Sequence, residues 1–151
     1  FQRAWQLKNA KPEMYGHWCR MEIREQEWTK AAEAAGKGLE RLPDNRLLLY
    51  FSGYAKSRLA KEFQAGLHRG KAEKEMMEAR RDLETALKAN RDLDEKGKSL
   101  NPDIYRALVL VCEMAEDLRS LRHYFDLWKK EYPDDPDAAT EWERISRKYS
   151  F

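Results

Sequence analysis

Basic side chains gather in the middle of the chain, where they could bind phosphate or an acidic protein face. The cluster consists of Arg69, Lys71, Lys74, Arg80 and Arg81. Acidic residues such as Glu73, Glu78 and Asp82 interleave with these cations, and opposite charges three or four residues apart on a helix commonly pair with each other. The segment around His68 also lacks an aromatic ring on which a base could stack. Nucleic-acid binding through positions 68–81 is therefore an alternative, not the leading interpretation.

The histidines and cysteines do not form a pattern that indicates catalysis or metal binding. His17 and Cys19 lie two positions apart, and one helix cannot direct residues i and i+2 at a single ion. The sequence identifies no partner for His68 or His123. Glycine-rich phosphate loops and the GxSxG and HExxH motifs do not occur. We therefore predict no enzymatic activity, no catalytic residue, no metal site and no cofactor.

Composition indicates one helix-rich domain. The chain has 151 residues, of which 42% are hydrophobic and 37% are charged, enough to bury a core and too polar for a membrane protein. Its 29 Lys and Arg residues against 27 Asp and Glu residues give a net charge of +2, so no general attraction to nucleic acid or an anionic membrane is expected. Cys19 and Cys112 lie in apolar stretches without a CxxC pair. This predicts buried free thiols and favours a reducing, cytoplasmic location.

Three similar turns that contain proline divide the helical pattern. They are Leu42–Asn45, Leu100–Asp103 and Tyr132–Asp135. Each turn supplies Asp or Asn where the next helix needs an N-cap. Proline ends one helix and can begin the next, because the first helical turn has no partner for its N–H group. Since signals for strands are almost absent, we predict an all-α fold.

The stretch Glu27–Asn45 resembles the second helix and closing turn of a tetratricopeptide repeat (TPR), a unit of 34 residues. Ala31 and Gly38 stand at the family's small positions, and Pro43 stands at its closing proline. Small residues at these positions let two helices approach closely. Pro102 and Pro136 are 34 residues apart, which agrees with the repeat length. The resemblance extends over nearly the whole chain.

The resemblance implies a single TPR-like solenoid over 1–151, with about three antiparallel helix pairs and a terminal capping helix. Residues 1–11 would be the tail of a preceding repeat, followed by repeats over 12–45, 46–101 with insertions, and 102–135, and by the capping helix over 136–151. In the second repeat, helices are expected over roughly 46–63 and 74–90, with an extended loop over 64–71 and another long connection over 91–99. Gly53 would stand where these two helices cross. We expect neither Phe1 nor Phe151 to be a natural end of the protein.

The same resemblance implies that the first helices of successive repeats line a concave groove. The groove residues would be Arg20, Arg24, Tyr50, Tyr54, Arg58, Arg106 and Glu113. Arginine binds carboxylates through two parallel hydrogen bonds, and tyrosine offers a rigid contact surface with a polar tip. The Lys/Asn clamp with which one TPR subclass grips chaperone tails is not reproduced, because only Arg106 is chemically comparable at the matching positions. The expected partner is a protein or peptide with acidic and apolar side chains.

These features predict a protein-binding or scaffolding module without a membrane partner. Two alternatives stay open: nucleic-acid binding through positions 68–81, and self-association through the exposed terminal helices. Binding to phosphate should weaken steeply with added salt, whereas peptide binding should weaken much less. Dilution would reveal self-association, since an associated species dissociates at low concentration.

Overall fold

The computed structural model of the chain describes residues 12–89 and 99–151, and every regular element within these two segments is an α-helix. The predicted all-α fold is confirmed. The helices are α2 (Pro12–Arg24), α3 (Trp28–Arg41), α4 (Arg46–Ala65), α5 (Arg69–Lys88), α6 (Asn101–Met114), α7 (Leu118–Glu131) and α8 (Pro136–Tyr149). The predictions for residues 1–11, and those for most of the connection over 91–99, lie outside the described residues.

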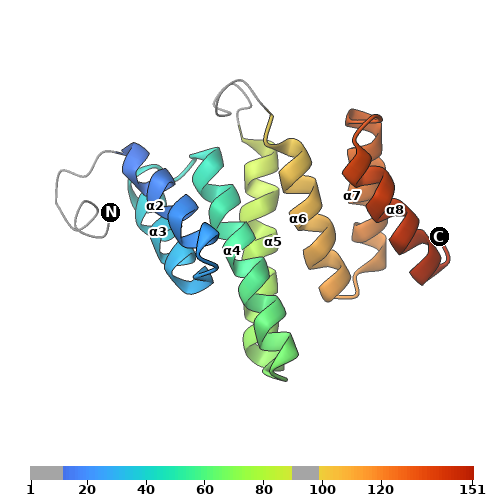
Figure 1. Ribbon diagram of the computed structural model, residues 1–151, viewed down its shortest axis with the longest axis horizontal. Coiled ribbons are helices and arrows are strands. Elements are labelled where there is room, and N and C mark those ends of the chain that lie inside the picture. Colours follow the sequence, from blue (N-terminus) through green and yellow to red (C-terminus); the bar gives the residue numbers. More distant parts are fainter. Residues whose placement is uncertain (1–11, 90–98) are drawn as a thin grey trace.

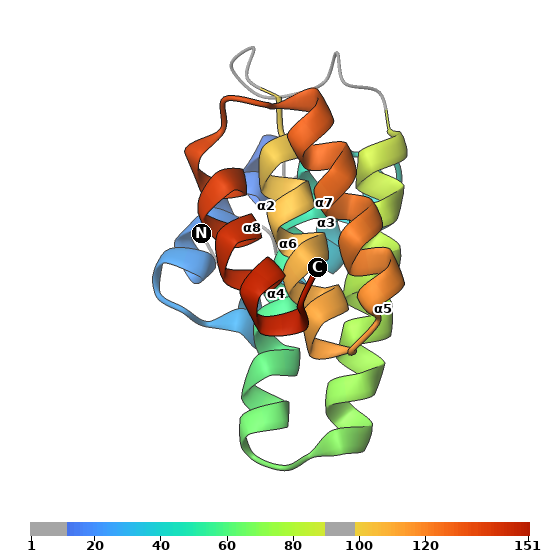
Figure 2. The same ribbon diagram turned by 90° about the vertical axis from the view of Figure 1, so that its right-hand side faces the viewer.

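The helices stand side by side in chain order along the long axis of the molecule (Figure 1). In the view along that axis, α2, α4, α6 and α8 form one layer, and α3, α5 and α7 form the other (Figure 2). Consecutive helices contact each other, and α4 also contacts α2 and α6 within its own layer. α4 thus packs against α2, α3, α5 and α6, which places it at the centre of the packing.

One type of turn joins the two helices of each pair. In the three turns, a residue with positive φ follows the first helix: Gln26 at 57°, Leu67 at 63° and Glu116 at 57°. The next residue donates its N–H group to a carbonyl five positions earlier, as Glu27 does to Glu22 at 2.8 Å. This hydrogen-bond pattern is that of the Schellman motif, which satisfies carbonyl groups at the end of a helix. The local structure therefore repeats three times along the chain.

The turns between pairs confirm two of the three predicted N-caps. The side chain of Asn45 accepts a hydrogen bond from the N–H of Leu48 at 3.0 Å, and the side chain of Asp135 accepts one from the N–H of Asp137 at 2.9 Å. At the start of α6 the prediction is wrong, because Leu100 occupies the N-cap position and makes no side-chain cap. Asn101 is buried instead and accepts a hydrogen bond from Arg46. Satisfying a buried guanidinium takes precedence there over capping the helix.

Two glycines lie where helices approach most closely. A Cβ atom added to Gly53 of α4 would lie 2.5 Å from Cγ of Leu83 and 3.1 Å from the carbonyl oxygen of Ala79, both on α5. A Cβ atom at Gly38 of α3 would lie 2.6 Å from Cδ1 of Leu48. These distances are shorter than van der Waals contact, so the predicted role of both glycines in close helix packing is confirmed.

The second helix pair is longer than expected, and its loop is shorter. The extended loop predicted over 64–71 is wrong, because only positions 66–68 lie outside a helix. The helix expected from about residue 74 begins at Arg69. Good helix formers fill this stretch, and the single Gly70 is not sufficient to break the helix. α4 and α5 have 20 residues each, compared with 13 in α2, and their hairpin projects beyond its neighbours (Figure 1).

Both cysteines are free and buried, as the sequence predicts. Burial raises the pKa of the Cys19 thiol to about 12 and the pKa of the Cys112 thiol to about 11. Neither side chain therefore provides a thiolate near neutral pH. Within the described segments, no helix is long and apolar enough to cross a membrane.

We predict that Gly53→Ala lowers the free energy of unfolding by about 1–3 kcal/mol, because the added methyl group overpacks the contact between α4 and α5. Gly36→Ala is the matched control. Gly36 lies in α3 with no atom within 4 Å of an added Cβ, so alanine should stabilise the protein by up to about 1 kcal/mol through its helix propensity. Urea denaturation followed by circular dichroism measures both. Equal gains in the two variants would contradict the close contact at Gly53.

Candidate functional site

A hollow of about 710 Å³ lies between α4 and α6 and is the candidate site. Ile23 of α2 reaches one end of it, and α8 contributes Glu141 and Arg144. Its other charged and aromatic residues come from the two central helices. They are Tyr50, Phe51, Tyr54, Arg58 and Lys61 of α4, and Asp103, Arg106 and Glu113 of α6.

Four residues of α4 form a continuous row along one wall of the hollow: Tyr50, Tyr54, Arg58 and Lys61. Their spacing of four, four and three residues places them on one face of the helix. We call this row the α4 stripe. The ring centroids of Tyr50 and Tyr54 are 6.0 Å apart, and Trp28 meets Tyr54 edge-on at 5.8 Å. The N-terminal half of the stripe is therefore a packed aromatic surface.

The polar ends of the α4 stripe make no hydrogen bond or ion pair with the rest of the described chain. Within the described residues, neither tyrosine hydroxyl has a hydrogen-bond partner, and neither Arg58 nor Lys61 has an acidic one. The guanidinium of Arg58 lies over the ring of Trp28, 5.2 Å from its centroid, which orients it without neutralising it. Burial, together with the nearby Asp103, raises the pKa of the Tyr50 hydroxyl above its ordinary value. Tyr50 therefore stays a neutral hydrogen-bond donor at physiological pH.

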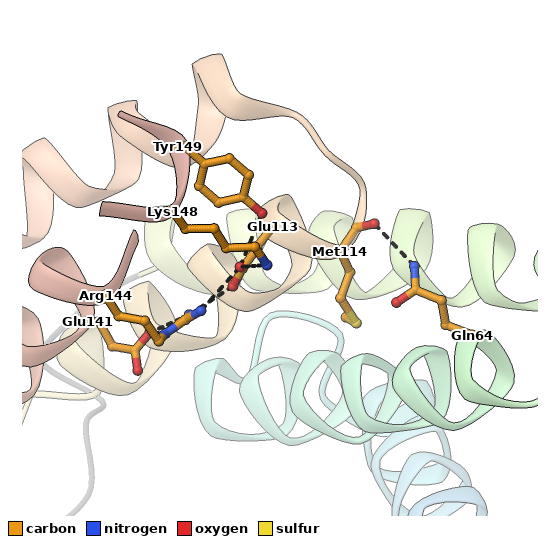
Figure 3. Close-up of polar contacts among 7 residues, drawn as sticks. All are labelled: Gln64, Glu113, Met114, Glu141, Arg144, Lys148 and Tyr149. Atoms are coloured by element: carbon orange, nitrogen blue, oxygen red, sulfur yellow. Dashed lines mark hydrogen bonds and ion pairs between the residues drawn. The ribbon is translucent and has the colours of Figure 1, made fainter. Parts of the chain in front are cut away.

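The opposite wall is internally paired. Arg106 of α6 makes ion pairs with Asp137 of α8 and, at 3.7 Å, with Asp103. Glu113 accepts two hydrogen bonds from Arg144, at 2.8 and 3.2 Å. Lys148 and Tyr149 donate to the same carboxylate at 3.1 and 3.2 Å, as Figure 3 shows. Arg106 and Glu113 of α6 therefore hold α8 in place. They are already paired, unlike the cations Arg58 and Lys61 of α4.

These donors set the charge state of Glu113. Its side chain is only 12% exposed. The hydrogen bonds from Arg144, with those from Lys148, hold the pKa of its carboxyl at about 2, below its ordinary value of 4.5. Charge-assisted hydrogen bonds of this kind stabilise the ionised form. α8 is therefore attached to α6 through a carboxylate that stays ionised in all but strongly acidic solution.

One hydrogen bond closes the hollow at the C-terminal ends of α4 and α6. The side-chain amide of Gln64 donates to the carbonyl of Met114 at 3.2 Å, which links the last turn of α4 to the end of α6 (Figure 3). A second hollow lies on the far side of this bond, since Gln64 and Met114 line both spaces.

Five of the seven predicted groove residues line the hollow: Tyr50, Tyr54, Arg58, Arg106 and Glu113. Arg20 and Arg24 do not line it. The guanidinium of Arg20 lies 5.6 Å from the centroid of the Phe51 ring, and Arg24 is exposed at the end of α2. Whether the five bind a ligand stays a prediction.

The sequence analysis missed Lys61 and Arg144. Lys61 lies one turn beyond Arg58 on the same helix face, so extension of the same periodicity would have found it. Arg144 could not be found in this way, because its place in the hollow depends on how α8 packs against α6.

The structure separates the five residues of the basic segment. Arg80 is held by Glu84 at 2.7 Å and by Asp117 at 2.8 Å, and this bond keeps the pKa of Asp117 at about 2. Lys71 lies 5.7 Å from the centroid of the Phe63 ring. Arg69 faces the second hollow, whereas Arg81 lies beside Lys56, Glu78 and Asp82, with Lys74 exposed on α5. These cations therefore do not form a single basic surface.

We predict that Glu113→Gln lowers the free energy of unfolding at pH 7 by about 1–2 kcal/mol, through loss of charge-assisted hydrogen bonds. Because the pKa of Glu113 is lower in the folded protein than in the unfolded chain, its contribution is complete above pH 4.5 and is lost as the pH falls towards 2. The variant should therefore lose less stability than the wild type across that range. Asp117 titrates in the same range, so a smaller slope remains.

Urea denaturation at several pH values between 7 and 2 measures this effect. Glu143→Gln is the control, because Glu143 pairs on the surface with Arg147 alone among the described residues and should leave the slope unchanged. Parallel stability curves for the wild type and Glu113→Gln would show that the carboxylate does not anchor α8.

Comparison with known proteins gives no relative for this chain. No protein-family model matches the sequence, and no curated protein or solved structure matches it. The resemblance to the tetratricopeptide family thus rests on the residues of this chain alone and stays a prediction.

Proposed function

We propose that this chain is a TPR-like helical-repeat solenoid that binds a segment of another protein in the groove beside α4. Three features support the fold assignment. The helices alternate between two layers, the turns within the three pairs share one backbone geometry, and the turns at 42–45 and 132–135 share another. Repetition of the same local geometry in a fixed order is expected of stacked repeats.

The α4 stripe is the observation that carries the functional proposal. Tyr50 and Tyr54 offer two hydroxyls that have no hydrogen-bond partner in residues 12–89 and 99–151, beside a packed aromatic surface. Arg58 and Lys61 continue the row with two cations that lack a carboxylate within the described residues. Polar groups left unpaired in a concave surface are suited to a ligand, and Tyr and Arg are the side chains that contribute most to binding energy at protein interfaces.

The chemistry of the two walls defines the ligand. The cation of α6, Arg106, already pairs with Asp103 and with Asp137 of α8, so it offers an acidic ligand less than the cations of α4 do. The carboxylates of the ligand would bind Arg58 and Lys61 at the C-terminal end of the stripe. Its apolar or aromatic side chains would lie against Tyr50 and Tyr54. A peptide with acidic residues next to apolar ones fits this order.

We predict that a random peptide library selected on the immobilised chain yields acidic peptides with apolar neighbours. Arg58→Glu should weaken such a peptide by about tenfold to a hundredfold, because loss of a charge-assisted hydrogen bond is worth about 1.5–3 kcal/mol. Lys61→Glu should act in the same direction, and Tyr54→Phe, which removes only the hydroxyl, should have a smaller effect. Isothermal titration calorimetry measures each dissociation constant.

Lys74→Glu is the matched control. Lys74 is an exposed cation of α5 that does not line the groove, so the same reversal of charge there should leave binding unchanged. An equal loss of affinity in Lys74→Glu and Arg58→Glu would indicate general electrostatic attraction and would refute the groove. Capture of RNA that weakens steeply with salt, without selection of peptides, would favour the nucleic-acid alternative instead.

A further inference from the structure

A second surface lies at the projecting end of the α4–α5 hairpin. α4 and α5 extend past the adjacent helices, so their connecting turn stands apart from the rest of the packing (Figures 1 and 2). The surface formed by this turn, the first half of α5 and the end of α6 surrounds the second hollow, of about 670 Å³. Its apolar residues include Leu67, Met76, Met77, Val111, Met114 and Ala115. We call it the tip surface.

Leu67 occupies a position that is unfavourable for leucine in two respects. Its φ of 63° is in the left-handed region, which non-glycine residues with large side chains rarely adopt. Its side chain is also 81% exposed. The two turns of the same type have polar residues at this position, Gln26 and Glu116. A strained, exposed leucine where a polar residue would serve the fold indicates a role outside the fold.

The tip surface combines a protruding side chain with a hollow that could receive one. Met77, beside Leu67, is 70% exposed. Met76 and Val111 are buried and lie at the base of the hollow. Among the described residues, the other exposed large apolar side chain is Leu118, so the surface holds most of the exposed apolar bulk. Methionine side chains adapt their shape to an incoming apolar group.

The charges at the rim of the tip surface are of both signs. Arg69 is exposed and has no acidic partner in the described part of the chain, and Glu73 and Glu116 have no basic partner there. Arg80 is already held by Asp117 and Glu84. A partner that offers a carboxylate to Arg69 and a cation to Glu73 or Glu116 would complement this rim. A second copy of the same surface offers both.

We infer that the tip surface is the interface of a two-fold symmetric dimer of this chain. Leu67 of each copy enters the hollow of the other, against Met76 and Val111, and Arg69 of each copy pairs with Glu73 or Glu116 of the other. A protruding group and its receptor on the same surface, with a rim that is complementary to itself, are what an isologous interface requires. This interface differs from the terminal helices and does not depend on the proposed groove function.

The first test is sedimentation equilibrium of the full chain from micromolar to millimolar concentration, with the wild type and Leu67→Asn. Asparagine tolerates a positive φ better than leucine, so the variant should unfold at equal or higher urea concentration. Its dimer dissociation constant should nevertheless rise by about tenfold or more. Weaker association together with undiminished stability cannot come from misfolding. A wild type that is monomeric throughout, or a dimer that Leu67→Asn leaves unchanged, would overturn the inference.

The second test separates the charges of the rim. The rim charges are those at positions 69, 73 and 116. In Arg69→Glu all three are carboxylates, and in the double variant Glu73→Lys/Glu116→Lys all three are cations. Each should be monomeric alone, because like charges meet across the two-fold axis, and an equimolar mixture should form a heterodimer. Arg81→Glu, on another face of α5, is the control that should dimerise like the wild type. Failure of the mixture to associate, or wild-type dimerisation of either variant alone, would refute the rim pairing.

Discussion

The guanidinium of Arg46 lies where three helices meet, and the distance between the two walls of the groove depends on it. Arg46 begins α4, is 1% exposed, and donates to the carbonyl of Ala86 near the end of α5 at 2.7 Å. It also donates to Asn101 at the start of α6. A charge so far from water is tolerated only when its N–H groups are satisfied. Because α4 and α6 form the walls, this junction fixes how far apart they stand at that end.

The two walls then differ in what they do with their charges. On α6, Arg106 and Glu113 are engaged by Asp137 and Arg144 of α8, so that wall is fixed by its own ion pairs. On α4, the ring of Trp28 orients Arg58, and neither Arg58 nor Lys61 has a carboxylate partner among the described residues. The hollow thus has one wall fixed by its own ion pairs and one wall whose cations are unpaired within the described residues. Under the proposed function, an acidic ligand would bind to the second wall.

Local signals in the sequence were sufficient for part of this structure. Asn45 and Asp135 were identified as caps because capping depends on residues within one turn. Gly53 was identified because it stands at the helix-crossing position of the repeat pattern that the sequence resembles. The cap at α6 was wrong since Asn101 serves a residue 55 positions away in the sequence. A contact between residues so far apart in the sequence cannot be predicted from the local pattern.

The candidate site shows the same division. The members of the α4 stripe lie on one helix, and three of them, Tyr50, Tyr54 and Arg58, were named from the sequence. The contact of Arg144 with Glu113 needs the packing of α8 on α6, which no pattern within either helix encodes. The loop expected over 64–71 was wrong for a different reason. Good helix formers surround Gly70, so α5 already begins at Arg69, and a single glycine costs a helix too little to end it.

The length of α4 has a geometric consequence for the whole array. α4 has 20 residues and α2 has 13, a difference of seven. At about 100° per residue, seven residues rotate a helix by about 700°, only about 20° short of two full revolutions. The chain therefore leaves the longer helix on nearly the same side as it leaves the shorter one, and the same turn can direct α5 back along α4. Growth in steps of two revolutions preserves the phase of the stack, so one pair can be lengthened into a protrusion while its neighbours keep their places.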